Sequence, residues 1–414
     1  MTTQHHTPRA TVEERLSPDH EAVVTATLPL VGSRIGEIAP TFYRRMFSAH
    51  PELLRDTFNR GNQAQGAQQK ALAASVASFA TLLVTPGAPS PRELLERIGH
   101  KHASLGITAE QYQVVHDHLF AAIVEVLGED VVTAEVAAAW DEVYWIMART
   151  LIAFEADLYA GAEVAPGDVF RTARVVERVE ESADVASFVL AGPDPASPLP
   201  DFVPGQYVSV GVRLPDGARQ LRQYSLSGPT GTGHWRLTVR RVDATGTDPA
   251  GEVSSWLHAN LREGDDLEVT LPFGDLTVRE LGTGPAALVS AGIGLTPMLG
   301  ILHHLAAHEP DRPLTVLHAD RDADDAALVT ELRELVGRLS HAELHLWFER
   351  GTAPDASRGL MDIDAVTLDP SAEILVCGPN AFLQAVRVQL TKAGVSPERV
   401  HYELFAPNDW LLPT

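Results

Sequence analysis

The spacing of apolar residues changes twice along the chain, and this change constrains the fold more than any single motif. In residues 17–160, apolar residues recur at helical spacing, as in QYQVVHDHLFAAIVEVL, and strand signals are almost absent. Two stretches, SPRE at 90–93 and TAEQ at 108–111, have the pattern of a helix capping box. We therefore predict one all-α domain at 17–160.

The remaining chain has two further patterns. After the Gly- and Pro-containing stretch GAEVAPGDVF come short β-type runs separated by PDG, GTG and EGD turns. These runs predict a small antiparallel β-barrel domain at 166–278. From about residue 284, short apolar strands such as AALVSAG and EILVCGP alternate with helical segments. This alternation predicts an α/β doubly wound domain with a parallel sheet at 284–407, and the length of 414 residues suits such a multidomain chain.

Charge and cysteine content narrow the function classes. The net charge of −23 disfavours phosphate backbones and anionic lipid, so we expect no nucleic acid and no membrane partner, and nothing implies a protein partner. The single cysteine, Cys377, excludes an intrachain disulfide framework and a cysteine-based metal cluster. The first 16 residues lack the apolar run of a secretory signal and have no assigned role, and we identify no apolar stretch of about 20 residues. We expect a cytoplasmic protein.

Motifs for binding a flavin lie in the β-rich segment. RQYS at 222–225 offers a bidentate guanidinium donor for phosphate, a tyrosine ring and a hydroxyl, and PGQY at 204–207 adds a turn and a second tyrosine. GEVSSWLH at 251–258 begins a helix, whose free N–H groups bind phosphate well. Each motif alone is weak, because such a strand is usually only amphipathic.

Motifs for binding a dinucleotide follow in the α/β segment. VSAGIGLTPML at 289–299 places Gly292 and Gly294 between a strand and a helix, where backbone can approach a pyrophosphate. Pro297 stands where the usual fingerprint has its third glycine. LVCGPN at 375–380 ends a strand at the carboxyl edge of the sheet, where ligands bind in open α/β folds.

In this order the four motifs resemble the ferredoxin–NADP⁺ reductase superfamily over about 240 residues. The resemblance implies that FAD is held by Tyr207, Arg222, Gln223, Tyr224, Ser225, Gly251, Val253, Ser254 and Ser255. It implies that NADH or NADPH is held by Gly292, Gly294, Thr296, Pro297, Cys377, Gly378 and Pro379. An aromatic residue near the chain end HYELFAP, here Phe405, would cover the flavin. Leu295 and ELFAP depart from the family pattern on the nicotinamide side, which leaves cofactor preference open.

Two histidines in ERIGHKHASLG raise a question about the helical domain. His102 shares one apolar stripe with Leu95 and Ile98, and therefore points into the domain. His100 is displaced by about 200° around the helix axis, which predicts that it faces solvent. His102 by itself could be an ordinary core histidine or a metal ligand.

The rest of the helical domain resembles a globin, and a globin followed by a flavin reductase is the layout of flavohaemoglobins. Two features support the resemblance. The stretch PTFYRRMFSAHPELLRDTFN at 40–59 has Phe58 at the position where globins pack a phenylalanine on haem. His102 follows Phe58 at the spacing of the globin iron ligand. The resemblance implies haem b, with Tyr43, Gln68 and Leu72 on the distal side and Tyr112 and Glu155 beside His102. Tyr43 would donate a hydrogen bond to the bound O₂. Glu155 lies on an apolar helix face and needs a partner if buried; the alternative places it at the solvent edge.

The resemblance implies an oxidoreductase, a nitric oxide dioxygenase that converts NO and O₂ to nitrate, with NAD(P)H electrons passing through FAD to haem. One alternative is an NAD(P)H-dependent reductase acting on O₂, peroxides or other acceptors. Another is a haem gas sensor, against which the intact reductase motifs argue. Asp320 and Asp322 favour NADH, whereas Arg321 between them could contact a 2′-phosphate.

Overall fold

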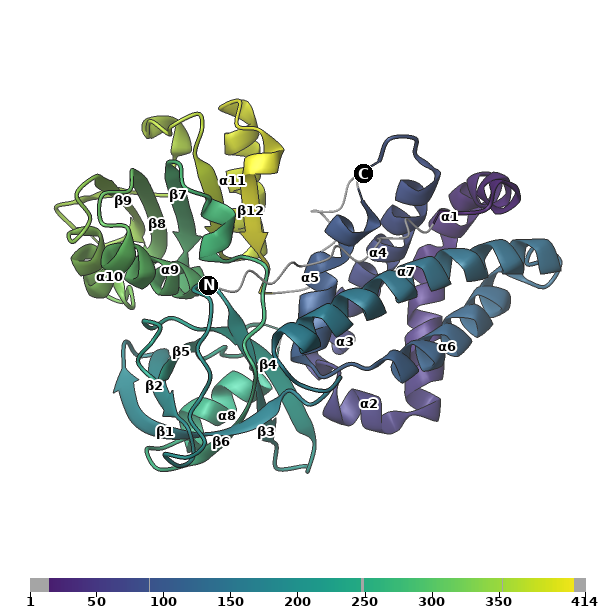
Figure 1. Ribbon diagram of the computed structural model, residues 1–414, viewed down its shortest axis with the longest axis horizontal. Helices are drawn as coiled ribbons and strands as arrows, with labels where there is room; N and C mark the ends of the chain where they lie inside the picture. Colours follow the sequence, from purple (N-terminus) through teal and green to yellow (C-terminus); the bar gives the residue numbers. More distant parts are fainter. Residues whose placement is uncertain (1–14, 89, 247–248, 352, 406–414) are drawn as a thin grey trace, which may run out of the picture.

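The computed structural model describes residues 15–88, 90–246, 249–351 and 353–405. A helical part, a curled antiparallel sheet and a parallel α/β part follow one another along the chain (Figure 1). This architecture confirms the predicted fold class.

The helical part buries one continuous apolar core. Its helices are α1 (Pro18–Ala49), α2 (Pro51–Asp56), α3 (Arg60–Ala64), α4 (Ala67–Val84), α5 (Pro91–Ser104), α6 (Ala109–Leu127) and α7 (Ala134–Gly161). The Gln111 side chain bonds back to the Thr108 N–H at 2.8 Å, as a capping box requires. At the other predicted box, Ser90 instead accepts from the Arg92 N–H. The first turns of α5 and α6 are therefore fixed by their own sequence.

Helix α1 corrects one expectation. By length and composition it is apolar enough to cross a membrane, with a mean hydropathy of 1.2 over its best window, although we identified no such stretch in the sequence. Its Val24, Ile38, Phe42 and Met46 are buried in the core that α1 shares with α4, α6 and α7. Its apolar character therefore serves packing within the helical part.

The antiparallel sheet follows the order β4-β3-β6-β1-β2-β5. Its strands are β1 (Phe170–Glu180), β2 (Val185–Ala191), β3 (Tyr207–Arg213), β4 (Arg219–Ser225), β5 (Trp235–Arg240) and β6 (Asp266–Thr270). A bridge between Leu226 and Leu237 brings the two edges of the sheet together, so the sheet curls into a barrel around buried residues such as Phe188 and Val210. Helix α8 (Glu252–Asn260) packs against this core through Val253 and Leu257.

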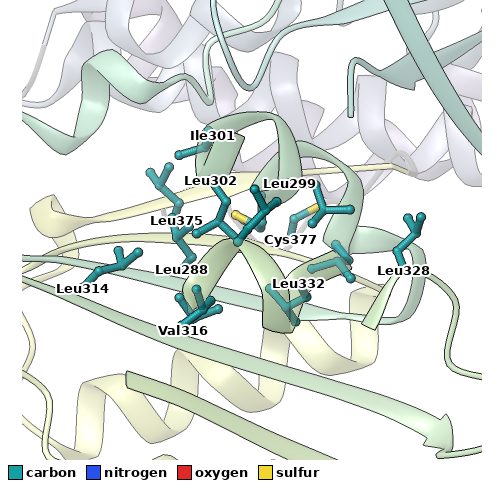
Figure 2. Close-up of a cluster of buried hydrophobic side chains, with 14 of the residues drawn as sticks. Leu288, Leu299, Ile301, Leu302, Leu314, Val316, Leu328, Leu332, Leu375 and Cys377 are labelled. Carbon is teal, nitrogen blue, oxygen red and sulfur yellow. The ribbon is translucent and has the colours of Figure 1, made fainter. Parts of the chain in front are cut away.

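The parallel sheet follows the order β10-β9-β8-β7-β11-β12. Its strands are β7 (Ala286–Ala291), β8 (Leu314–Asp322), β9 (Ala342–Arg350), β10 (Ala356–Arg358), β11 (Glu373–Cys377) and β12 (Val400–Glu403). Helices α9 (Leu295–His308) and α10 (Val329–Val336) cover one face, around the cluster drawn in Figure 2. Helix α11 (Asn380–Lys392) covers the other face. Strand order reverses at β7, so the ends of β7 and β11 form the crevice where such sheets bind ligands.

Candidate functional site

His102, the iron ligand predicted from the sequence, is held by a carboxylate and a phenol. His102 lies near the end of α5, and its Nδ1 is 2.9 Å from Glu155 Oε1 and 2.9 Å from the Tyr112 hydroxyl. The Tyr112 hydroxyl donates to the same carboxylate oxygen at 2.5 Å. A carboxylate on Nδ1 fixes the proton there, which leaves Nε2 as the nitrogen that can bind a metal.

Glu155 is buried, with 2% of its surface exposed, so the solvent-edge alternative is wrong. Its partners compensate the cost of burying a carboxylate on the apolar face of α7. Burial, reinforced by the nearby carboxylate, raises the pKa of Tyr112, so the phenol keeps its proton and remains a donor. Close packing holds the two helices in place, because a Cβ on Gly99 would lie 2.2 Å from the Phe154 ring.

The distal residues predicted from the sequence come together in space. Tyr43 on α1 is buried, with its ring 5.9 Å from the Phe58 ring, edge to face. Leu72 on α4 belongs to the same apolar core. Burial raises the pKa of Tyr43, while hydrogen bonding to Gln68 opposes this rise. The phenol therefore stays protonated as a donor.

Gln63, which sequence reasoning missed, lies on this distal side. Its Oε1 accepts from Gln69 Nε2 at 2.9 Å, whereas its own Nε2 is buried without a hydrogen-bond partner among the described residues. A buried, unpaired amide donor is costly unless a ligand accepts from it. The available signal was a run of glutamines, NQAQGAQQ, directly after Phe58. Together with the free Nε2 of His102, this donor fits a haem and a polar ligand.

His100 contradicts its predicted exposure to solvent. It lies between the helical part and the barrel, where its Nδ1 accepts from the Gly274 N–H at 3.1 Å. Its ring meets Phe154 edge to face at 5.4 Å. Burial lowers the pKa of His100. The apolar stripe of α5 indicates only which face packs inside the helical part. It gives no sign that the opposite face, which carries His100, meets the barrel.

The residues predicted to hold FAD gather beside α5. Tyr207 on β3 pairs with Ser225 on β4, and the adjacent β4 residues present Arg222 and Tyr224. Burial raises the pKa of Tyr207, and hydrogen bonding to Ser104 of α5 opposes this rise. The start of α8 comes close, since Glu252 lies 3.9 Å from Arg222 Nη2. Gln223, Gly251, Val253, Ser254 and Ser255 complete this group on β4 and α8.

The residues predicted to hold the nicotinamide nucleotide meet where β7 and β11 end. A Cβ on Gly294 would lie 2.4 Å from the Cys377 carbonyl oxygen, so only glycine allows the two loops to approach. Gly292 has φ 53°, and the loop enters α9 through Thr296 and Pro297. Gly378 and Pro379 lead from β11 into α11. Burial raises the pKa of the Cys377 thiol.

Phe405 lies two residues beyond β12, the neighbour of β11, and 48% of its surface is exposed. The partly exposed Phe405 ring therefore lies at the carboxyl ends of the parallel strands, as Cys377 does. The last two residues of HYELFAP, 406 and 407, lie outside the described part of the chain.

A charged cluster around the buried Glu403, at the junction of the three parts, was also missed by sequence reasoning. Glu403 ends β12, and burial together with Asp275 raises its pKa to about 8, although Arg97 and Lys101 of α5 oppose the rise. Arg97 Nη2 also donates to the Tyr402 carbonyl at 2.9 Å. The only signal was that Glu403 lies within HYELFAP. Helix α5 therefore contacts both other parts of the chain.

Comparison with known families and proteins covers nearly the whole chain. The Globin family matches residues 40–151, the oxidoreductase FAD-binding domain matches 172–278 and the oxidoreductase NAD-binding domain matches 288–388. A flavohemoprotein of Bordetella parapertussis is 40% identical, over 94% of this chain and 98% of that protein. One of Chromobacterium violaceum is 39% identical, over 95% and 99%.

Two solved structures extend the comparison. A flavohemoglobin of Malassezia yamatoensis with bound FAD and heme has a TM-score of 0.86 at 34% identity, covering 94% of this chain and 100% of that one. The flavohem-like FAD/NAD-binding domain of a nitric oxide dioxygenase from Vibrio cholerae has a TM-score of 0.54 at 36% identity, covering 57% and 99%.

Proposed function

The chain belongs to the flavohemoproteins, oxidoreductases that join a globin to FAD- and NAD-binding domains, and on this premise we propose that it is a nitric oxide dioxygenase. Its substrates are NO, O₂ and a reduced nicotinamide nucleotide. Two NO and two O₂ become two nitrate ions as one NAD(P)H is oxidised to NAD(P)⁺ with release of a proton. The observation that carries the proposal is the His102–Glu155–Tyr112 triad, together with the buried, protonated Tyr43 of the predicted distal side.

We assign haem b to residues 17–160, FAD to 166–278 and the nicotinamide nucleotide to 284–407. When bound, FAD accepts a hydride and releases single electrons, and haem iron binds O₂. The protein residues bind and orient these groups and supply protonated donors.

His102 is the iron ligand in this proposal, through Nε2. Glu155 Oε1 accepts from Nδ1 and makes the imidazole a stronger electron donor. The Tyr112 hydroxyl, which donates to the same oxygen, keeps the carboxylate in place. Phe58 would pack against the porphyrin.

Tyr43 is the distal donor. Its raised pKa keeps the hydroxyl protonated, so it can donate to an anionic oxygen ligand while Gln68 orients it. Leu72 supplies an apolar wall. The unpaired Gln63 Nε2 is a second donor for the same ligand.

On the reductase side, Tyr207 and Tyr224 would hold the flavin ring and Arg222 would bind its phosphates. The Gly292–Gly294 loop and the Cys377–Pro379 loop hold the nucleotide, and Phe405 covers the flavin. We assign NADH as the preferred donor, because Asp320 and Asp322 at the end of β8 repel a 2′-phosphate.

An anaerobic absorbance experiment followed by NO turnover tests the proposal. The purified protein should show a Soret band and flavin absorption, and NADH should shift the Soret band to that of ferrous haem. Under air, NO should then be consumed with nitrate as product, two per NADH. Reduction of O₂ or peroxide without nitrate would favour the alternative reductase, and an unmoved Soret band would contradict haem ligation by His102.

A further inference from the structure

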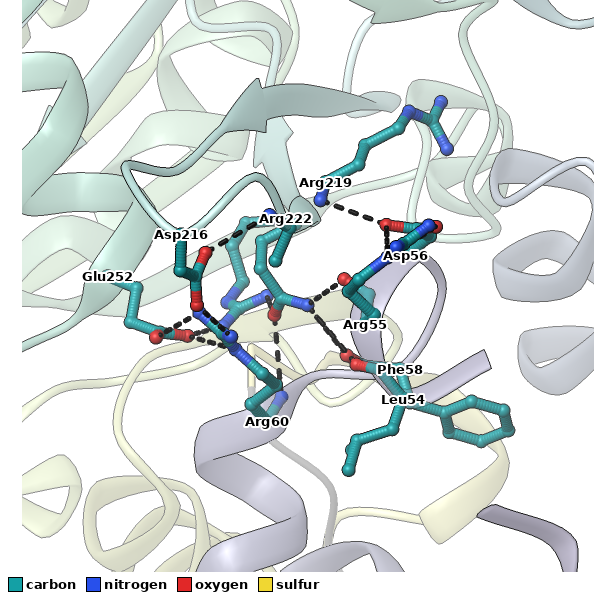
Figure 3. Close-up of polar contacts among 11 residues, drawn as sticks. Leu54, Arg55, Asp56, Phe58, Arg60, Asp216, Arg219, Arg222 and Glu252 are labelled. Atoms are coloured by element: carbon teal, nitrogen blue, oxygen red, sulfur yellow. Dashed lines mark hydrogen bonds and ion pairs between the residues drawn. The ribbon is translucent and has the colours of Figure 1, made fainter. Parts of the chain in front are cut away.

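Arg60, the first residue of α3, reaches from the helical part to the barrel. Its Nη2 donates to Glu252 Oε1 at 2.7 Å and its Nη1 to Asp216 Oδ2 at 2.6 Å (Figure 3). Glu252 is 192 residues away in sequence. Arg60 stands two residues after Phe58, so the residue proposed to pack on haem and the residue that reaches the barrel lie in the same corner of the helical part.

Glu252 is the first residue of α8, the helix whose start we assign to the FAD phosphates. A carboxylate at that place opposes a phosphate, because both are negative and both are attracted to the same free N–H groups. Arg222, the proposed phosphate ligand, is the other cation near this carboxylate, 3.9 Å away.

The geometry shows which guanidinium holds Glu252. Its carboxylate is at hydrogen-bond distance from Arg60 and beyond that distance from Arg222. Arg222 instead uses Nη1 to donate to the Leu221 carbonyl at 2.7 Å and to Gln220 Oε1 at 3.2 Å. Within the described part of the chain, the only ion-pair partner of Arg222 Nη2 is Glu252, at 3.9 Å. This nitrogen is therefore available to donate a hydrogen bond to a ligand.

Hydrogen bonds to backbone groups fix Arg60 relative to β4, the strand that carries Arg222. Gln220 on β4 is fully buried, and its Nε2 donates to the carbonyls of Arg55 at 3.0 Å and Phe58 at 3.2 Å. Its Oε1 accepts from the Arg60 N–H at 3.4 Å. Asp56 accepts from the Arg219 N–H at 3.1 Å (Figure 3). The start of α3 is therefore attached to the strand that carries Arg222.

We propose that Arg60 is part of the FAD pyrophosphate site, contributed by the globin domain across the domain boundary. It holds the Glu252 carboxylate away from Arg222, so Arg222 stays free for the phosphates. Arg60 is thus a positioning residue for the cofactor. This inference rests on the proposed assignment of FAD to Arg222 and α8.

The test is FAD titration of full-length protein from which flavin has been removed and haem retained, followed by flavin fluorescence. Arg60→Gln should weaken FAD binding by about tenfold or more, as expected for loss of a charge-assisted contact. The matched control is Arg55→Gln in the same corner, because Arg55 forms an exposed pair with Asp56. This control should leave FAD affinity unchanged.

The decisive variant is Arg60→Gln combined with Glu252→Gln. If Arg60 acts by holding the carboxylate, the second substitution removes the competing charge and should restore most of the lost affinity. A residue that only joined the domains would show no such rescue. Unchanged FAD affinity in Arg60→Gln, or no rescue in the double variant, would overturn the inference. Failure of the unsubstituted protein to bind FAD would instead contradict the proposed function.

Discussion

Ser209 on β3 donates a hydrogen bond to Ser104 on α5, with 3.1 Å between the two hydroxyl oxygens. Gln223 Nε2 donates to Ser209 at 2.9 Å, and the Ser104 hydroxyl donates to the Lys101 carbonyl at 2.8 Å. A buried chain of hydrogen bonds therefore joins the strand proposed to hold the flavin to the helix that carries His102. Because buried polar groups keep their partners, this chain fixes the two sites relative to each other.

Substitution of Glu155 should weaken the proximal ligand. In Glu155→Gln the amide keeps the shape but loses the charge that accepts from His102 Nδ1, so the imidazole becomes a poorer electron donor. We expect the rate of NO turnover to fall by about 10- to 100-fold. The Fe–His stretching band, measured by resonance Raman on the ferrous protein, should move to lower frequency. An unchanged band would contradict the proposed role.

Substitution of Tyr43 should separate dioxygenation from electron transfer. Tyr43→Phe keeps the ring packing on Phe58 but removes the donor hydroxyl. Nitrate formation should fall by on the order of a hundredfold, because a lost donor to developing negative charge has effects of that size. Reduction of a dye by the flavin should not change, since the reductase residues are untouched. Equal losses in both assays would count against the distal assignment.

Substitution of Gly294 should disturb the nucleotide crevice. In Gly294→Ala the new Cβ would lie 2.4 Å from the Cys377 carbonyl oxygen, so backbone must move. We expect a loss of about 1–3 kcal/mol in stability and a higher KM for NADH, measured by thermal unfolding and steady-state kinetics. Gly284→Ala is the control, because a Cβ added there would have no atom within 4 Å. Equal behaviour of the two variants would refute the prediction.

The pKa of Glu403 predicts a dependence of stability on pH. The folded-state pKa is about 8 against an ordinary value of 4.5, so between these two pH values the folded protein holds more protons than the unfolded chain. The contribution of this carboxyl to the free energy of unfolding is therefore complete below pH 4.5 and is lost as the pH rises to about 8.

Glu403→Gln should remove this dependence, so its thermal midpoint should fall less than that of the unsubstituted protein between pH 5 and about pH 9. The exposed Glu398, which lies in the short turn before β12, provides the control Glu398→Gln. Parallel curves for Glu403→Gln and the unsubstituted protein would show that this carboxyl does not titrate as described.

Much of the architecture was determined by the sequence alone, because it depends on local spacing. Helical periodicity, strand alternation and short apolar strands each reflect which faces of an element are buried, and that pattern is repeated residue by residue. The apolar helix face also indicated that Glu155 could be buried, whereas its place beside His102 came only from the family resemblance and needed the packing of α7 on α5. These features need no knowledge of which distant segments meet.

Only the tertiary structure decided what happens where domains meet. His100 is half-buried because a second domain covers the face of α5 that its own domain leaves open. Arg60 forms an ion pair with Glu252, and Asp275 lies close enough to Glu403 to raise its pKa. No periodic pattern encodes contacts across such large sequence separations. Such contacts depend on how whole elements pack, and the pKa of Glu403 is raised because that packing removes water around its carboxyl group.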